Sequence, residues 1–179
     1  MDVLFEDNHI IIVNKKSGEI VQGDKTGDKT LADSVKNYIK KKYNKPGNVY
    51  LGTTHRLDRP VSGAIIFAKT SKALTRLNEM FQKKEIKKTY WALCVNPPMQ
   101  QSGNLKHYLL KNSKNNKTAA HKNEVKNSKF SELNYKFLKN LGNNYLVEVD
   151  PLTGRPHQIR VQLSSINCII KGDLKYGAM

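Results

Sequence analysis

Two short runs near the carboxyl end of the chain have apolar residues at every second position, and this period restricts the fold more than any other feature. The first run spans residues 133–137 and the second spans residues 145–149, with Gly142-Asn143-Asn144 between them. A period of two places successive side chains on opposite faces of a strand, and Gly and Asn favour a turn. The sequence therefore predicts a β-hairpin within a largely antiparallel sheet.

Two other segments have helical patterns. Thr30 precedes Asp33 in an arrangement typical of a capping box, and apolar residues then recur on one helical face until Lys45-Pro46-Gly47. Ser71 can cap a second helix, whose apolar stripe lies within residues 74–81. We expect both stripes to pack in a core.

Four further runs have the composition of strands, and two segments between the elements do not. The strands are predicted at residues 9–13, 64–68, 89–95 and 105–110. Residues 15–18 predict a turn, and residues 111–129, rich in Lys, Asn and Ser, predict a mobile loop that contacts phosphates. Without βαβ alternation or an internal repeat, the pattern favours an α+β fold with helices packed on a mixed, largely antiparallel sheet.

The size and charge of the chain suggest one domain with an anionic partner. Its 179 residues are enough for a single domain with its own core, which we expect to span residues 1–179. Lys and Arg number 31 against 15 Asp and Glu, for a net charge of +16. This excess favours nucleic acid as partner. The alternative is a solvated, lysine-rich surface without a partner.

Cysteine and histidine usage argues against disulfides and metal. Cys94 and Cys168 are too few for a disulfide framework or a four-ligand zinc site, and His9, His107 and His121 lack ligand spacing. Nucleotide-cofactor motifs are absent, so we expect no metal or cofactor. The sequence also lacks a cleavable leader pattern and a run of membrane-spanning length, so we expect a soluble, cytoplasmic protein that does not bind membranes. Because a small domain without a heptad pattern or an evident interface stripe is by default a monomer, we expect a monomer.

Asp58 lies between Arg56 and Arg59 at a chain reversal, within His-Arg-Leu-Asp-Arg-Pro-Val-Ser-Gly at residues 55–63. Neighbouring positive charge favours the ionised carboxylate, which is then suited to act as a nucleophile, a weak base or an ion-pair partner. Carboxylate nucleophiles are best known for attacking the anomeric carbon of a sugar. Without further context, such a cluster is more often a salt-bridged turn than a catalytic site.

Three segments with many polar residues occur in a fixed order. They are residues 55–63, Lys-Lys-Thr-Tyr-Trp-Ala at 87–92 and Leu-Thr-Gly-Arg-Pro-His-Gln-Ile-Arg at 152–160. Together they resemble the motifs of the RluA-type pseudouridine synthases, and the likeness continues to residues 172–177. The resemblance implies that family's catalytic fold and the cofactor-free isomerisation of specific uridines in ribosomal or transfer RNA.

The resemblance also implies roles for individual residues. Asp58 would bond covalently with the target nucleotide, and Arg56 would help to take the place of the nucleotide flipped out of the RNA. Tyr90 would pack against the target ring and remove a proton late in the reaction. Arg160 would pair with Asp58, and Ile159 would press on the uracil face.

Other cationic side chains in the three motifs are suited to bind RNA. Arg56, Arg59, Lys88 and Arg155 could hold phosphates beside the flipped nucleotide. We assign His157 an RNA-binding or structural role rather than a chemical one.

Simpler structural roles remain open for three of these residues. Tyr90, beside Trp91 in a strand pattern, could be a core or interface residue. Arg160 falls on a predicted helix and could pair with any nearby carboxylate. His157 could cap that helix or stack on another ring.

The chemistry of the motifs agrees with isomerisation. A glycosidase uses two carboxylates, whereas the three motifs supply a single carboxylate among arginines, a tyrosine and a histidine. Isomerisation breaks the glycosidic bond without adding water, so the freed base must turn inside a closed, apolar pocket. Tyr90 and Ile159 are suited to line its walls.

The chain departs from the family pattern at two places. Val61 stands where many relatives have threonine, and we expect little chemical effect because Asp58 is retained. The sequence stops at Ala178-Met179, where relatives usually continue, so we expect a catalytic domain shortened at its carboxyl end. We also expect no separate amino-terminal RNA-binding domain.

The leading hypothesis is therefore an RNA pseudouridine synthase with Asp58 as nucleophile. One alternative is a non-catalytic RNA-binding module, suggested by the basic surface. A further alternative is an RNA N-glycosidase, which the lack of a second carboxylate in the motifs makes the weakest of the three.

Overall fold

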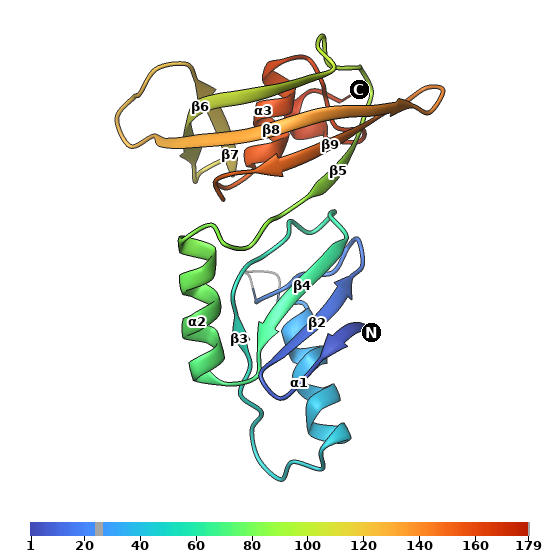
Figure 1. Cartoon of the computed structure of the whole chain (residues 1–179), viewed down its shortest axis with the longest axis vertical. Helices are drawn as coiled ribbons and strands as arrows, with labels where there is room; N and C mark the ends of the chain where they lie inside the picture. Colours follow the sequence, from blue (N-terminus) through green and yellow to red (C-terminus); the bar gives the residue numbers. More distant parts are fainter. Residues whose placement is uncertain (24–26, 179) are drawn as a thin grey trace. The chain divides into compact units, whose positions relative to one another are not determined.

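The computed structural model describes residues 1–23 and 27–178 of the chain, which forms two compact units (Figure 1). The first unit is Met1–Ile86 and the second is Lys87–Met179. Met179, the last residue of the carboxyl end that we expected to be shortened, lies outside the described residues. The expectation of one domain over residues 1–179 stays a prediction.

The first unit contains a four-stranded antiparallel sheet in the order β1-β2-β4-β3. Its elements are β1 (Asp2–Glu6), β2 (Ile10–Lys15), α1 (Leu31–Lys42), β3 (Gly52–Thr53), β4 (Gly63–Ala68) and α2 (Ser71–Gln82). Helix α1 packs with Ile11, Val13 and Phe67, whereas α2 packs with Ile10 and Ile66. Because neighbouring strand residues face opposite ways, the two helices cover opposite faces of the sheet.

The predicted cap of α1 is confirmed, whereas the predicted cap of α2 is wrong by one residue. Thr30 Oγ1 accepts a hydrogen bond from the Asp33 amide at 3.0 Å, and the Asp33 carboxylate accepts from the Thr30 amide. In α2, Thr70 is the capping residue and Ser71 is the first helical residue. Thr70 has extended backbone angles, which let its hydroxyl reach the Ala73 amide at 3.1 Å.

The second unit contains a five-stranded antiparallel sheet in the order β5-β9-β8-β6-β7. Its elements are β5 (Tyr90–Cys94), β6 (Ser102–Asn112), β7 (Lys117–His121), β8 (Lys129–Asn140), β9 (Tyr145–Pro151), α3 (Gln158–Ser165) and the 3-10 helix η1 (Leu174–Tyr176). Strands β8 and β9 form the predicted hairpin. Leu163 of α3 is fully buried in the core that these strands share. The expected α+β fold is confirmed, with two antiparallel sheets.

The predicted mobile loop over residues 111–129 is wrong. Strand β6 continues to Asn112, and β7 pairs with it as a hairpin. Thr118 of β7 is buried: its amide donates to Tyr176 Oη at 2.8 Å, and its hydroxyl donates to the Pro156 carbonyl at 3.1 Å. Strand pairing and these distant partners order a segment whose own composition contains too few apolar residues to form a core.

Lys15 has an unexpected position, because it lies at the buried end of β2 rather than in an exposed turn. Its side chain is 0% exposed. The ammonium group donates to the carbonyl oxygens of Lys16, Asp58, Arg59 and Val61, at 3.1, 3.3, 3.0 and 2.6 Å. Three of these carbonyls belong to the segment that carries Asp58, so Lys15 ties that segment to the end of β2.

Burial lowers the pKa of Lys15, while the negative charges of Glu19 and Asp58 act in the opposite direction. A buried ammonium group is costly unless its protons are bonded, and here carbonyl oxygens surround it. The lysine therefore contributes stability only together with the segment that it binds.

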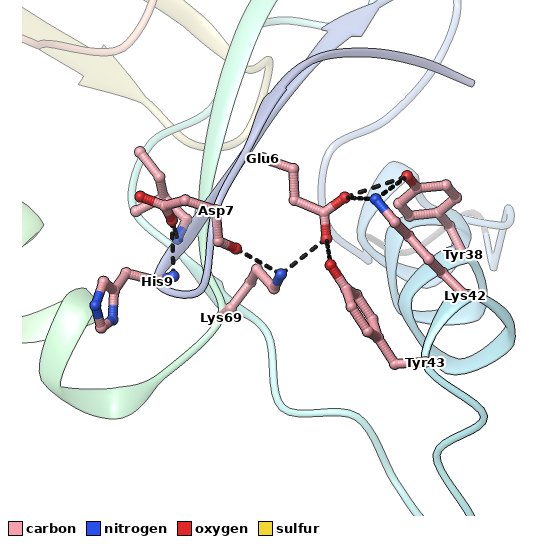
Figure 2. Close-up of polar contacts among 8 residues, drawn as sticks. Glu6, Asp7, His9, Tyr38, Lys42, Tyr43 and Lys69 are labelled. Atoms are coloured by element: carbon pink, nitrogen blue, oxygen red, sulfur yellow. Dashed lines mark hydrogen bonds and ion pairs between the residues drawn. The ribbon is translucent and has the colours of Figure 1, made fainter.

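A second polar cluster, the Glu6 cluster, has a buried carboxylate at its centre and joins β1 to α1 and to the segment between β4 and α2 (Figure 2). The cluster comprises Glu6, Tyr38, Lys42, Tyr43 and Lys69. The carboxylate of Glu6 accepts from Lys42 at 2.6 Å, Lys69 at 2.8 Å and Tyr43 at 2.9 Å. Burial alone would raise the pKa of Glu6, but the hydrogen bonds from Lys42, Lys69 and Tyr43 lower it to about 2. Lys69 also faces the Tyr43 ring at 4.8 Å.

Two observations bear on the expectations about cysteines and membranes. Cys94 and Cys168 are both buried and unoxidised. Within residues 1–23 and 27–178, the helices are too short or too polar to cross a lipid bilayer.

We expect Lys15→Met to destabilise the protein by about 2 kcal/mol, because the variant removes the ammonium donor that four carbonyl oxygens share. Urea unfolding of both proteins at pH 7 measures the difference. The matched control is Lys16→Met, an exposed neighbour, which should change the unfolding free energy by less than about 0.5 kcal/mol. Equal effects of the two substitutions would contradict the structural role of Lys15.

We expect the Glu6 cluster to produce acid sensitivity. A carboxyl whose pKa is lower in the folded than in the unfolded chain adds stability above its ordinary pKa of 4.5, and this stability is lost as pH falls towards 2. Glu6→Gln should therefore cost about 2 kcal/mol at pH 7 and progressively less between pH 4.5 and pH 2. Thermal or urea unfolding over that pH range measures the difference, and a pH-independent gap would contradict the assignment.

Candidate active site

Asp58 lies in an anchored loop between β3 and β4, residues 54–62, which we call the Asp58 loop. Its first part is fixed to Ile66 in β4: the Thr54 hydroxyl donates to the Ile66 carbonyl at 2.8 Å, and the Ile66 amide donates to His55 Nε2 at 3.1 Å. Because Nε2 accepts this bond, the ring proton of a neutral His55 is on Nδ1. The backbone that enters the loop is thus held by both polar groups of one strand residue.

The second part of the Asp58 loop is fixed to the segment that follows β2. The Ser17 hydroxyl donates to the Pro60 carbonyl at 2.8 Å, and the Gly18 amide donates to the Arg59 carbonyl at 2.8 Å. The Val61 amide donates to the Asp58 carbonyl at 3.0 Å, which closes a turn. With Lys15 beneath it, this network holds the backbone of Asp58 while its side chain stays half-buried.

The two arginines beside Asp58 are exposed. Arg59 pairs with Asp28 at 2.9 Å and donates from Nε to the Gly18 carbonyl at 3.1 Å. About half of each side chain in the Arg59–Asp28 pair is exposed, so the pair is screened by water and contributes little stability. Both guanidinium groups are therefore accessible to an anionic ligand.

In the second unit, Gln158 organises the third motif from the start of α3. Its side chain is buried, and its carbonyl oxygen accepts from the Thr153 hydroxyl at 2.8 Å and from the Arg155 amide at 2.9 Å. Its amide group donates to the Glu132 carbonyl in β8 at 3.0 Å. Gln158 thus joins the turn before α3 to the sheet.

His157 precedes α3 in a left-handed conformation, with φ of 55°, and makes no capping bond through its side chain. Its ring meets the Tyr176 ring edge to face at 5.7 Å, and Nδ1 lies 2.8 Å from Tyr176 Oη. Of the two structural roles considered for His157, the contacts support stacking rather than capping.

Arg160 lies on α3, as predicted, and forms a bidentate salt bridge with Asp173. Nε and Nη2 donate to the two carboxylate oxygens at 2.7 and 2.8 Å. The guanidinium carbon lies 5.0 Å from the centre of the Tyr176 ring. A pairing of Arg160 with Asp58 stays a prediction.

Tyr90 and Ile159 pack against the same core cluster, although they come from β5 and α3. Trp91, the next residue after Tyr90 in β5, has the opposite orientation: it is 70% exposed and donates to Glu148 at 3.2 Å. Tyr90 thus packs at the edge of the core, and its part in chemistry stays a prediction. Lys88 and Arg155 are half-buried.

The structure brings the predicted residues together in two groups. Arg56, Asp58 and Arg59 share the Asp58 loop of the first unit. The members of the second unit are Lys88, Tyr90, Arg155, His157, Ile159 and Arg160. A single site formed by both groups stays a prediction. Among the described residues, no group of three or more His, Cys, Asp or Glu side chains is placed to hold a metal ion.

Sequence reasoning missed Lys15, Gln158 and Asp173, which hold the groups in place. A signal was present for Lys15, because a period of two places it on the same strand face as the buried Ile11 and Val13. Gln158 lies in the third motif and Asp173 lies in residues 172–177, but the sequence pattern gives neither residue a partner. The Glu132 carbonyl and the Arg160 guanidinium come within hydrogen-bonding distance of them only in the folded chain.

Comparison with known proteins finds the same family by its family model and by its relatives. Residues 9–165 match the family model described as RNA pseudouridylate synthase. "Ribosomal large subunit pseudouridine synthase C" of Rickettsia bellii is 34% identical over 176 residues, covering 98% of this chain and 56% of the relative. The protein of the same name from Buchnera aphidicola is 37% identical over 180 residues, covering 98% of this chain and 53% of the relative.

A solved structure also matches. "Human RNA Pseudouridylate Synthase Domain Containing 4" superposes with a TM-score of 0.84 and 26% identity, covering 98% of this chain and 69% of that one. The chain spans only about half the length of the curated relatives that it matches. Since the family model covers residues 9–165 and the motifs of the Asp58 loop and α3 lie within it, the chain belongs to the RNA pseudouridylate synthase family, of the RluA type.

Proposed function

We propose that this chain isomerises uridine to pseudouridine in RNA, with Asp58 as the nucleophile and without a cofactor. Family membership supports the reaction, and the anchoring of the Asp58 loop carries the assignment of the nucleophile. A reactive carboxylate benefits from a fixed backbone, because its approach to the sugar then needs little reorganisation.

The proposed reaction conserves every atom of the nucleotide. Asp58 bonds to the target nucleotide, the bond between C1′ and N1 breaks, and uracil is retained as a stabilised anion. The base turns, and C5 bonds to C1′ as the bond from C1′ to the Asp58 carboxylate breaks. The proton then leaves C5, and N1 takes up a proton to give pseudouridine. No water is consumed, so a second carboxylate to activate water is unnecessary.

In this proposal the second unit supplies the apolar walls of the uracil pocket and the positive charge that faces the Asp58 carboxylate. Tyr90 and Ile159 hold the uracil, since both lie at the edge of one apolar cluster. Tyr90 also accepts the late proton, and Arg160 stabilises the negative charge of Asp58.

Cationic side chains in both units would bind the RNA around the flipped nucleotide. Arg56 and Arg59 are exposed beside Asp58, whereas Lys88 and Arg155 belong to the second unit. Arg56 would fill the place of the flipped base. A phosphate could replace Asp28 as the partner of Arg59 at little cost in free energy, because the Arg59–Asp28 pair is exposed to water. His157, which is hydrogen-bonded to Tyr176, would have an RNA-binding or structural role rather than a chemical one.

We further propose ribosomal RNA as the first substrate to test, with transfer RNA as the alternative, in a cytoplasmic and monomeric protein. The named relatives from Rickettsia and Buchnera act, by their names, on the large ribosomal subunit. A net charge of +16 is suited to either RNA.

The same charge favours a second candidate function, a non-catalytic RNA-binding module. This candidate predicts that biological activity survives the loss of Asp58. An RNA N-glycosidase, in contrast, would release free uracil.

We expect Asp58→Asn to abolish pseudouridine formation while RNA affinity stays within about tenfold of wild type, because only transition-state chemistry is removed. Carbodiimide treatment and primer extension on RNA from cells with wild type, variant or no protein measure product. The matched control, Asp2→Asn, neutralises an exposed carboxylate of the same unit and should retain activity. Product from Asp58→Asn would refute the nucleophile, and free uracil would indicate the glycosidase.

We expect RNA binding to weaken steeply with salt. If Arg56, Arg59, Lys88 and Arg155 each contact one phosphate, the plot of log affinity against log salt concentration should have a slope of about −3, since each contact releases counterions. Arg56→Gln should reduce the magnitude of that slope by about 0.7. Filter binding at several salt concentrations measures it, and an unchanged slope would exclude a phosphate contact for Arg56.

A further inference from the structure

Arg160 is held more tightly than an arginine on a helix surface. Its guanidinium group donates to both oxygens of Asp173, at 2.7 and 2.8 Å. The Arg160 side chain is 20% exposed and that of Asp173 is 7% exposed, so water competes little for these bonds. A bidentate salt bridge fixes the plane of the guanidinium group as well as its position.

Asp173 is itself fixed by a compact turn, residues 170–178, which we call the C-terminal turn. The Asp173 amide donates to the Ile170 carbonyl at 3.1 Å, and the Asp173 carbonyl accepts from Tyr176 and Ala178 at 3.0 and 3.1 Å. Gly177 has φ of 109°, a conformation that favours glycine. The carboxylate that binds Arg160 therefore extends from a rigid backbone.

Tyr176 in the same turn provides a second surface for Arg160. Its ring faces the guanidinium carbon at 5.0 Å. Its hydroxyl accepts from the Thr118 amide at 2.8 Å, and its carbonyl accepts from the Ser164 hydroxyl of α3 at 2.8 Å. The hydroxyl of the ring is therefore anchored to β7, and the backbone of Tyr176 is anchored to the helix that carries Arg160.

We propose that Asp173, supported by Tyr176, is a positioning residue that fixes the guanidinium of Arg160 for the reaction. This inference rests on the proposed function, in which Arg160 stabilises the charge of Asp58. An arginine without such a partner samples many rotamers, whereas a group fixed in advance needs no reorganisation during the reaction. Asp173 acts only through Arg160 and does not touch the substrate.

A double-mutant cycle separates positioning from a merely structural role. Asp173→Asn should lower kcat by about 10- to 100-fold with little change in KM, by analogy with other residues that orient a catalytic group. Arg160→Gln should lower kcat at least as much. The double variant should be no slower than Arg160→Gln, because Asp173 has no effect once Arg160 is absent. Multiplied effects, or a wild-type kcat for Asp173→Asn, would overturn the proposal.

Asp173→Glu keeps the test informative if Asp173→Asn folds poorly. It retains the charge but moves the carboxylate by one methylene, so we expect a folded protein with kcat lowered about tenfold. A wild-type kcat for this variant would show that the position of the carboxylate does not matter, which overturns the proposal.

The matched control breaks a similarly buried ion pair in the first unit. Lys69 and Glu6 lie 2.8 Å apart with side chains 10% and 6% exposed. Lys69→Met should lower the melting temperature, but kcat measured well below that temperature should stay at the wild-type value. A loss of kcat equal to that of Asp173→Asn would mean that any lost buried pair slows the reaction, and would overturn a specific role for Asp173.

A spectroscopic readout separates failure of this inference from failure of the proposed function. The Nε–H signal of Arg160, assigned by its disappearance in Arg160→Lys, should be protected from exchange with water in wild type and unprotected in Asp173→Asn. If wild type forms no pseudouridine, the proposed function fails, while this signal still shows whether Asp173 holds Arg160. Unchanged protection in Asp173→Asn would overturn the positioning role.

Discussion

The buried ammonium group of Lys15 is the interaction on which the arrangement of the Asp58 loop depends. Its bonds to the carbonyls of Asp58, Arg59 and Val61 join three backbone groups of the loop to the end of β2. The Asp58 and Arg59 carbonyls also accept from the amides of Val61 and Gly18, so the ammonium group completes a network that already fixes the backbone of the loop. Lysine suits the task because its donors radiate from one point on a long apolar stem that can pass through the end of a sheet.

The second unit holds its own motif in a similar way. Gln158 joins the turn before α3 to β8, and Asp173 binds the guanidinium of Arg160 from the C-terminal turn. Each of these side chains is largely buried and hydrogen-bonded, whereas the motif residues that they hold are partly exposed. Fully bonded polar groups have few alternative arrangements, so they keep nearby exposed groups in place.

Sequence patterns correctly predicted the elements that depend on residues close together along the chain. The cap at Thr30 and the β8–β9 hairpin depend on residues a few positions apart, and both are confirmed. The loop predicted for residues 111–129 is wrong because its order has a distant cause: the Thr118 amide bonds to Tyr176, 58 positions away. Composition cannot reveal such a partner. The cap of α2 was misplaced by one residue because Thr70 and Ser71 are both good capping residues, and only the backbone angles distinguish them.

The sequence by itself determined the secondary structure that short-range periodicity encodes, the positive charge and the three ordered motifs that mark the family. These properties depend on neighbours along the chain, so they can be read without coordinates. Only the tertiary structure decided that Lys15 is buried beneath Asp58 and that Arg160 is held by Asp173. A charged side chain has the same covalent form in water and in a protein interior. Its role depends on which distant backbone or carboxylate the fold brings within hydrogen-bonding distance.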